Sequence, residues 1–251
     1  MTASFYDKLA PFYHLLYGDW EGAIQVQGRA LSQLLAELGV QKGEAVHDAA
    51  AGIGTQTVGL LEAGFAVSAS DNSQGAVARL DAELRGRALH ARTFVNDLRS
   101  LDGLPSASLQ AIIACDNSIP HLLTDADILR AFQQCYRSLA PAGVAVFSVR
   151  DYAKMERRSP DVRPYGLRVE HDRRFLAVQV WEWDQEQYDL SMYLTSELPD
   201  GTCTTEVLRS RYYAIAIERL LELLKAAGFV DVERRDDVLF QPVFFGRKPN
   251  I

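Results

Sequence analysis

The segment Val46-His47-Asp48-Ala49-Ala50-Ala51-Gly52-Ile53-Gly54 combines an acidic residue with two closely spaced glycines. The apolar pattern predicts that a strand ends at Asp48 and that a helix follows the glycines. Glycine lets the backbone approach a ligand more closely than a side chain would permit. The segment therefore predicts a binding site for a nucleotide-like cofactor. Thr57 stands where a G-x-G-x-x-G pattern has its third glycine, so the pyrophosphate of a dinucleotide is a less favoured ligand.

A second acid, Asp71, closes the next predicted strand, and a carboxylate there can accept hydrogen bonds from both hydroxyls of a ribose. The arrangement D-x-x-x-G-x-G followed by this acid resembles the first motif of class I S-adenosylmethionine-dependent methyltransferases. The resemblance implies that S-adenosylmethionine is the cofactor and that Asp97 and Leu98 contact its adenine. It implies a cofactor site formed by Tyr6, Asp48, Ala50, Gly52, Gly54, Asp71, Asn72, Asp97, Leu98 and His121.

The segment Cys115-Asp116-Asn117-Ser118-Ile119-Pro120-His121-Leu122 is similar to the C-x-G-N-S-x-x-H-L segment of the glycine N-methyltransferase and glycine/sarcosine methyltransferase group. Here the segment is one residue shorter, with Asp116 in place of a leucine-glycine pair. The similarity implies that Asn117 faces the methyl-transfer centre and that His121 lies beside the methionine part of the cofactor. The alternative for His121 is a structural histidine at the edge of the core.

Arg150 follows the fifth predicted strand and resembles the family arginine that holds the carboxylate of an amino-acid substrate. A planar guanidinium can pair with a carboxylate through two hydrogen bonds. The alternative is a surface ion pair with the neighbouring Asp151. Two looser similarities imply that Tyr17 reaches the acceptor from the N-terminal segment and that Tyr213 contributes to the substrate site. Asn117, Tyr17 and His121 are therefore the expected catalytic residues.

The chain also departs from the family pattern. The arginine expected a few residues after the Tyr17-Gly18-Asp19 turn is absent, and residues 23–27 occupy that region. His47 replaces a usual leucine, and we expect it to be a neutral, hydrogen-bonded core residue. The aromatic-rich N-terminal segment could fold over a sulfonium, whose positive charge is favoured beside aromatic faces.

The elements that must position these residues alternate along the chain. Strands are expected at about 45–49, 65–70, 91–95, 110–115 and 143–149, with helical patterns between them. This alternation predicts an α/β fold with parallel strands and helices on both faces. Period-2 patterns at 174–183, 188–198 and 204–213 predict an inserted antiparallel sheet, with a tight turn at residues 198–201. A helix at 217–227 and strands around 230–234 and 239–247 would close the main sheet at an antiparallel edge.

We therefore expect a Rossmann-like class I methyltransferase with a mostly parallel seven-stranded sheet, an antiparallel terminal hairpin strand and an inserted antiparallel lid sheet. Residues 1–251 would form a single domain, with 1–22 as an N-terminal cap and 155–214 as the lid.

Composition narrows the expected partners. A net charge of -7 over 251 residues gives no basic footprint for nucleic acid, and no apolar run is long enough to span a membrane. Cys115, Cys135 and Cys203 lack zinc-ligand spacing, so reduced thiols and no metal are expected. We expect a cytoplasmic protein that acts on a small molecule. The sequence leaves open whether it forms a homo-oligomer.

The principal hypothesis is methyl transfer to the amine of a small, carboxylate-bearing metabolite such as glycine or sarcosine. A second hypothesis is methylation of oxygen or carbon in a secondary metabolite, with His121 as general base. A third is a module that binds S-adenosylmethionine without catalysis, and a nicotinamide-dependent oxidoreductase is a more distant alternative.

Overall fold

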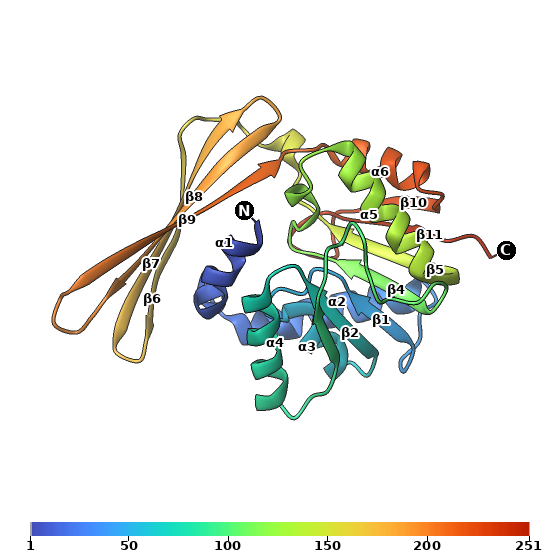
Figure 1. Cartoon of the computed structure of the whole chain (residues 1–251), viewed down its shortest axis with the longest axis horizontal. Coiled ribbons are helices and arrows are strands. Elements are labelled where there is room, and N and C mark those ends of the chain that lie inside the picture. Colours follow the sequence, from blue (N-terminus) through green and yellow to red (C-terminus); the bar gives the residue numbers. More distant parts are fainter. Residues whose placement is uncertain (1, 251) are drawn as a thin grey trace.

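Seven strands form one mostly parallel sheet in the computed structural model, which describes residues 2–250 (Figure 1). Met1, the first residue of the expected cap, and Ile251 lie outside the described residues. The strands are β1 (Ala45–Asp48), β2 (Ala66–Asp71), β3 (Arg92–Val95), β4 (Leu109–Ala114), β5 (Leu139–Ser148), β10 (Val230–Arg235) and β11 (Val243–Arg247). Their order is β10-β11-β5-β4-β1-β2-β3, and β11 runs antiparallel to both neighbours. The predicted seven-stranded sheet with an antiparallel terminal hairpin strand is thus confirmed.

Helices cover the two faces of this sheet because alternate strand residues point to opposite sides. They are α2 (Trp20–Glu37), α3 (Thr55–Glu62), α4 (Gln74–Gly86), α5 (Asp125–Ser138) and α6 (Ile217–Ala226), with short 3-10 turns η2 (Ile119–His121) and η3 (Tyr152–Lys154). Ile113 packs with α2 and α3, whereas the adjacent Ile112 packs with α5 and α6. Gly28 and Gly59 bring α2 and α3 into backbone contact, since a Cβ on Gly59 would lie 2.7 Å from the Gly28 Cα.

A separate antiparallel sheet, here called the lid sheet, extends away from the main sheet (Figure 1). Its strands are β6 (Asp161–Glu170), β7 (Arg173–Asp184), β8 (Gln187–Glu197) and β9 (Cys203–Tyr213). The predicted turn between the last two strands is confirmed by a hydrogen bond from the Gly201 amide to the Leu198 carbonyl at 2.9 Å. Sequence patterning missed β6, and the final strand begins at Val243 rather than at residue 239.

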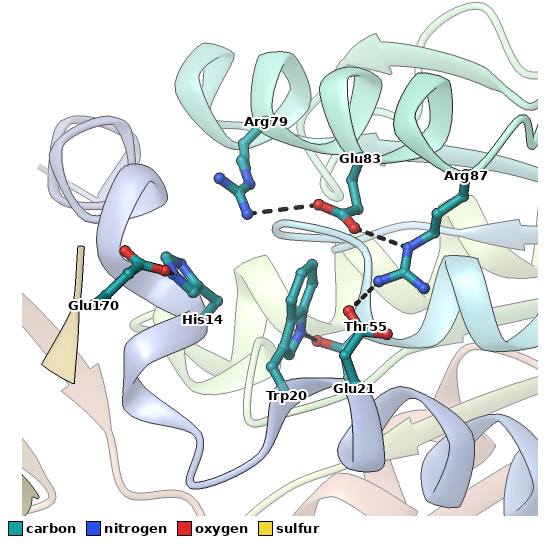
Figure 2. Close-up of polar contacts among 8 residues, drawn as sticks. All are labelled: His14, Trp20, Glu21, Thr55, Arg79, Glu83, Arg87 and Glu170. Carbon is teal, nitrogen blue, oxygen red and sulfur yellow. Dashed lines mark hydrogen bonds and ion pairs between the residues drawn. The ribbon is translucent and has the colours of Figure 1, made fainter. Parts of the chain in front are cut away.

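The N-terminal cap consists of α1 (Thr2–Leu9) and the 3-10 helix η1 (Ala10–Leu16). Asp7 anchors it to the start of α4, because its Oδ1 accepts hydrogen bonds from the Ser73 hydroxyl at 2.7 Å and the Gly75 amide at 2.8 Å. His14 and Glu170 join the cap to the lid sheet at 2.9 Å (Figure 2). The cap therefore contacts the lid sheet directly and contacts the main sheet through α4.

The residue that begins α2 secures the other end of the cap. The Trp20 indole donates a hydrogen bond of 2.9 Å to the Thr55 hydroxyl, and Arg79 and Arg87 lie 5.8 and 5.9 Å from its ring centroid (Figure 2). These contacts connect the chain entering α2 to α3 and α4.

Three further sequence expectations can be placed in the fold. His47 is fully buried and hydrogen-bonds Ser68 and Ser70 at 2.9 and 3.0 Å, as expected of a core histidine. Cys115, Cys135 and Cys203 are free thiols, and Cys203 is exposed. Among residues 2–250, no helix combines the length and apolar character needed to cross a bilayer.

Candidate functional site

A first cavity opens where the carboxyl ends of β1 to β4 meet the N-terminal cap. Its floor is the turn after β1, including Ala50 and Gly52. Gly52 has a φ of +53°, and a Cβ there would lie 3.4 Å from the Tyr13 ring. The absence of a side chain at Gly52 thus leaves space between the turn and Tyr13, and we call this space the Gly52 cradle. Ligands of open α/β sheets bind at this edge, beside the point where the strand order reverses.

Asp71 fastens the turn to β2 while remaining on the cavity wall. Its Oδ2 accepts a hydrogen bond from the Gly52 amide, and its Oδ1 accepts one from the Ser73 amide, both at 2.9 Å. Burial raises the pKa of Asp71, and these two amides partly oppose that rise. Each carboxylate oxygen has a second lone pair that can accept a ligand hydroxyl.

Two residues predicted to bind the cofactor lie behind the turn instead. Asp48 is 1% exposed and accepts a hydrogen bond of 2.7 Å from the Thr57 hydroxyl. Burial raises the pKa of Asp48 to about 7. Gly54 has a φ of +103°, and a Cβ there would lie 2.5 Å from a Leu80 methyl carbon. Both residues hold the turn in place, and neither lines the cavity.

The remaining predicted cofactor residues lie on the cavity wall. Tyr6, Asn72, Asp97, Leu98 and His121 all line it. Asp97 pairs with Arg99 at 2.6 Å, and this contact lowers the pKa of its carboxyl.

A second cavity of about 800 Å³ adjoins the first, and the two share Tyr13, Tyr17 and Asp116. The Tyr17 hydroxyl donates a hydrogen bond to Asp116 Oδ2 at 3.0 Å and accepts one from the Thr55 hydroxyl at 3.3 Å. Tyr17 is therefore held at the boundary between the cavities. The predicted placement of Tyr17 beside an acceptor is compatible with this geometry.

Arg150 lines the second cavity, whereas Asp151 does not. Asp151 pairs instead with Arg234 and with Lys154, the latter at 3.1 Å. The Arg150 guanidinium carbon lies 5.3 Å from the Trp181 ring centroid, and no carboxylate within residues 2–250 lies at ion-pair distance from it. The alternative of a surface ion pair with Asp151 is thus wrong.

Asn117 faces the core rather than either cavity, which corrects the expectation that it faces the reaction centre. It is 2% exposed, its amide nitrogen donates to the Tyr152 hydroxyl at 2.8 Å, and its Oδ1 accepts from the Arg150 amide at 3.0 Å. Its φ of +67° turns the chain after β4 and directs the side chain inward. Asn117 therefore positions the backbone that carries Arg150.

Tyr213 also lies elsewhere, because neighbouring residues of a strand point to opposite faces. Its hydroxyl donates to Asp125 Oδ1 at 3.0 Å, on the α5 side, and it lines neither cavity. The preceding Tyr212 is the inward residue, and its ring centroid lies 4.0 Å from that of His121. The prediction of Tyr213 as a substrate contact is therefore wrong by one residue, because Tyr213 lies on the opposite face of the strand from Tyr212.

His121 is held on both sides of its ring. Nε2 lies 2.8 Å from the Tyr6 hydroxyl, and Nδ1 lies 3.5 Å from the Ser210 hydroxyl. Burial lowers the pKa of His121 to about 3, and the Arg150 charge adds to this effect. His121 is consequently neutral near pH 7.

Sequence reasoning gave no site role to three residues at the boundary between the cavities, Gln27, Gln56 and Asp116. Gln56 donates hydrogen bonds to Gln27 at 2.7 Å and to Asp116 at 3.0 Å. Two departures from the family pattern could have pointed to these residues. Gln27 lies in the region where the cap arginine is absent, and Asp116 replaces the leucine-glycine pair.

The comparisons with known proteins agree with this geometry. Residues 46–143 match the family model described as a methyltransferase domain. A glycine/sarcosine N-methyltransferase of Halorhodospira halochloris is 33% identical over 134 residues, or 53% of this chain and 49% of the relative. In that match, the chain spans about half the length of the curated relative.

Two further similarities extend over most of the chain. A glycine/sarcosine N-methyltransferase of Aphanothece halophytica is 26% identical over 92% of this chain and 82% of its own. The sugar N-methyltransferase KedS8 of Streptoalloteichus sp. ATCC 53650 superposes with a TM-score of 0.77, covering 90% of this chain and 88% of its own at 16% identity. At that identity the structural likeness concerns the fold alone.

The residues around the first cavity fit S-adenosylmethionine. Asp71 offers acceptors for a ribose diol, Asp97 and Leu98 stand at the next strand end, and the Gly52 cradle admits close backbone approach. The Ser118 hydroxyl, on the wall of this cavity, is a buried polar atom that finds no hydrogen-bond partner among the described residues. The fold, the cofactor cavity and these relatives together support a class I S-adenosylmethionine-dependent methyltransferase, and residues 46–143 match the methyltransferase-domain family.

Proposed function

We propose that this protein transfers the methyl group of S-adenosylmethionine to the amine nitrogen of a small, carboxylate-bearing metabolite. The first cavity would hold the methyl donor, and the second would hold the acceptor. The glycine/sarcosine N-methyltransferases that the chain resembles support an amine acceptor, because their names state that chemistry.

The observation that carries the proposal is the unpaired guanidinium of Arg150 in the second cavity. An acceptor carboxylate would give this guanidinium two charge-assisted hydrogen bonds. Trp181 lies beside the guanidinium at 5.3 Å and limits its freedom. Arg150 would thus fix one end of the acceptor.

Bound S-adenosylmethionine supplies an electrophilic methyl group on a sulfonium. The chain's own contribution is alignment and exclusion of water, and positioning of this kind can supply roughly 7 to 11 kcal/mol. Tyr13 and Tyr17 stand on the wall shared by the two cavities, where they would confine the acceptor nitrogen near the donor. Two lid-sheet residues lie near this site. Trp181 of β7 lies beside the Arg150 guanidinium, and Tyr165 of β6 lines the second cavity.

The volume of the second cavity also bears on the acceptor. About 800 Å³ is at the upper end of the range for small-molecule sites and exceeds what glycine alone would fill. Its outer wall includes Leu16, Val26 and Phe240, which are apolar. Amino acids with an apolar side chain are therefore included in the proposed substrate class.

The placement of His121 disfavours the alternative of oxygen methylation. A general base must reach the acceptor proton, whereas His121 does not line the second cavity and both of its nitrogens face protein hydroxyls. Its pKa, lowered by burial to about 3, makes it a weak base.

An acceptor panel tests the proposal. The protein is incubated with S-adenosylmethionine and glycine, sarcosine, L-alanine, L-phenylalanine, ethanolamine, glucosamine or catechol, and S-adenosylhomocysteine release is measured. We expect turnover of the amino acids and little with ethanolamine, which lacks a carboxylate. Arg150→Ala should raise the KM for the amino acids by about 100-fold, as expected for loss of a buried charge-assisted pair.

The matched control is Arg174→Ala, which removes an exposed lid-sheet arginine that pairs with Glu197 at 3.0 Å. It should leave the amino-acid KM unchanged. Turnover of catechol or glucosamine but of none of the amino acids would overturn the proposal. An unchanged amino-acid KM in Arg150→Ala would overturn the role of Arg150.

A further inference from the structure

Asp116 stands where the two cavities meet, and its side chain belongs to the wall of both. It follows β4 with a φ of +56°, and Asn117 continues the left-handed turn. This turn directs the Asp116 carboxylate toward the cap and α3, where it contacts Tyr17 and Gln56. The position is a departure from the leucine-glycine pair of the similar family segment, which has no carboxylate there.

The two carboxylate oxygens of Asp116 have different surroundings. Oδ2 accepts hydrogen bonds from the Tyr17 hydroxyl and the Gln56 amide, both at 3.0 Å. Oδ1 is buried and accepts no hydrogen bond from any residue between 2 and 250. An unsatisfied buried acceptor is costly, and the cost is greater for a charged group. Oδ1 is therefore an acceptor that a ligand donor would complete.

Charge gives the second observation. Within the described residues no lysine, arginine or histidine nitrogen lies at ion-pair distance from Asp116, and no carboxylate lies at that distance from Arg150. The two charges act on each other across the second cavity, because Arg150 partly opposes the rise in the pKa of Asp116. The cavity thus presents a carboxylate and a guanidinium that form no direct ion pair. A zwitterionic amino acid carries the two complementary charges on adjacent groups.

We propose that Asp116 Oδ1 accepts a hydrogen bond from the amino group of the acceptor while Arg150 binds its carboxylate, so that the acceptor is an amino acid recognised at both ends. The zwitterion gives up one ammonium proton to solvent before its nitrogen attacks the methyl carbon and the bond from that carbon to sulfur breaks. This inference rests on the proposed function. It places the nitrogen at the wall shared with the first cavity, beside Tyr17, and the carboxylate at Arg150 in the second cavity. Burial also raises the pKa of Asp116, which reflects the cost that an ammonium partner would remove.

The test uses Asp116→Asn, which removes the charge and keeps a side chain that tolerates a left-handed backbone. Asp116→Gly is the second variant, because glycine adopts this conformation freely and removes the whole side chain. Asp231→Asn is the matched control, since Asp231 is exposed and also has a positive φ of +49°. Thermal unfolding checks that all three variants fold.

For the four amino acids of the panel, both Asp116 variants should raise KM by about 10- to 100-fold, as expected for loss of a hydrogen bond to a charged group. Inhibition by acetate, propionate and 3-phenylpropionate, which retain a carboxylate and lack the amine, should change less than about twofold. The dissociation constant of S-adenosylhomocysteine, measured by calorimetry, should also change less than about twofold. Asp231→Asn should change none of these values.

Two results would overturn the inference. If S-adenosylhomocysteine binding weakens as much as amino-acid binding, Oδ1 serves the ammonium of the donor's methionine part instead. If amino-acid KM values are unchanged, Asp116 has no role in recognition. Failure of the proposed function differs from both, because the unmodified protein would then methylate none of the amino acids.

Discussion

The backbone amide of Gly52 donates a hydrogen bond of 2.9 Å to Oδ2 of Asp71, which ties the glycine turn to the end of the neighbouring strand. One carboxylate thus both shapes the turn and lines the first cavity. The cofactor site is therefore assembled from two chain segments that depend on each other.

Replacing this carboxylate should weaken cofactor binding strongly. Asp71→Ala removes the ribose acceptors and releases the Gly52 amide, so we expect S-adenosylhomocysteine to bind at least about 10- to 100-fold more weakly. Calorimetry measures the dissociation constant, and Asp200→Ala at the exposed lid-sheet turn is the control. Equal affinity in Asp71→Ala would contradict the assignment of the first cavity to the cofactor.

The rate of methyl transfer to an amine should rise toward alkaline pH. Below the pKa of an acceptor's amino group most of it is protonated and has no free lone pair, so the rate should increase up to about tenfold per pH unit. The value of kcat/KM for the acceptor, measured between pH 6 and 9, reports this dependence. A flat profile over that range would argue against an amine acceptor.

Substitution of His121 should affect catalysis modestly and leave the pH profile intact. Its pKa is lowered to about 3, so it titrates outside the working range. Loss of its contacts with Tyr6 and Tyr212 should reduce kcat by less than about tenfold in His121→Asn, as for a residue that acts through packing. A loss of about a thousandfold with a vanished pH limb would identify a general base and favour an oxygen acceptor.

The buried His47 should make the protein less stable in acid. Burial lowers its pKa to about 4, so between pH 6.5 and 4 the unfolded chain binds a proton that the folded chain does not. Relative to His47→Gln, the wild type should lose about 2 to 3 kcal/mol of unfolding free energy between pH 7.5 and 4.5. Urea unfolding at both pH values measures this difference.

Comparison with a variant is needed because buried acids act in the opposite direction. Asp48, with its pKa raised to about 7, stabilises the folded state as the pH falls. The change His171→Gln on an exposed turn is the control for the loss of a histidine. A pH-independent difference between the wild type and His47→Gln would show that His47 does not contribute.

The contact between Gly28 and Gly59 should not tolerate a methyl group. A Cβ on Gly59 would lie 2.7 Å from the Gly28 Cα and 2.8 Å from the Ile24 carbonyl oxygen, both backbone atoms. Gly59→Ala should therefore reduce the unfolding free energy by about 1 to 3 kcal/mol or more through overpacking of α2 against α3. Gly86→Ala, at the end of α4 with open space around it, should be neutral or stabilising by up to about 1 kcal/mol.

The main sheet could be predicted because its strands alternate with clear helical patterns and end at Asp48 and Asp71. The strand β6 was missed because Pro164 and Gly166 interrupt its pattern, and its register shifts between them. The final strand was predicted too long because residues 239–241 are apolar in part but line the second cavity instead of pairing in the sheet. Apolar character alone does not distinguish a strand from a cavity wall.

Predictions of the site succeeded where a residue's position followed from the sheet edge and failed where it depended on a local turn. Arg150 lies at the expected sheet edge and lines the second cavity, and its role toward an acceptor stays a prediction. Asn117 faces inward because two consecutive residues have positive φ, which a spacing argument does not reveal. Tyr213 was chosen over Tyr212 because a strand pattern does not state which of two adjacent tyrosines points inward.

The N-terminal cap contributes Tyr13 and Tyr17 to both cavities, so its position affects both sites at once. A ligand that holds the cap in place in one cavity changes the free energy of binding in the other. By thermodynamic linkage this coupling is reciprocal, so each ligand must alter the other's affinity by the same factor. Under the proposed function, the short segment before α2 would therefore couple donor and acceptor binding.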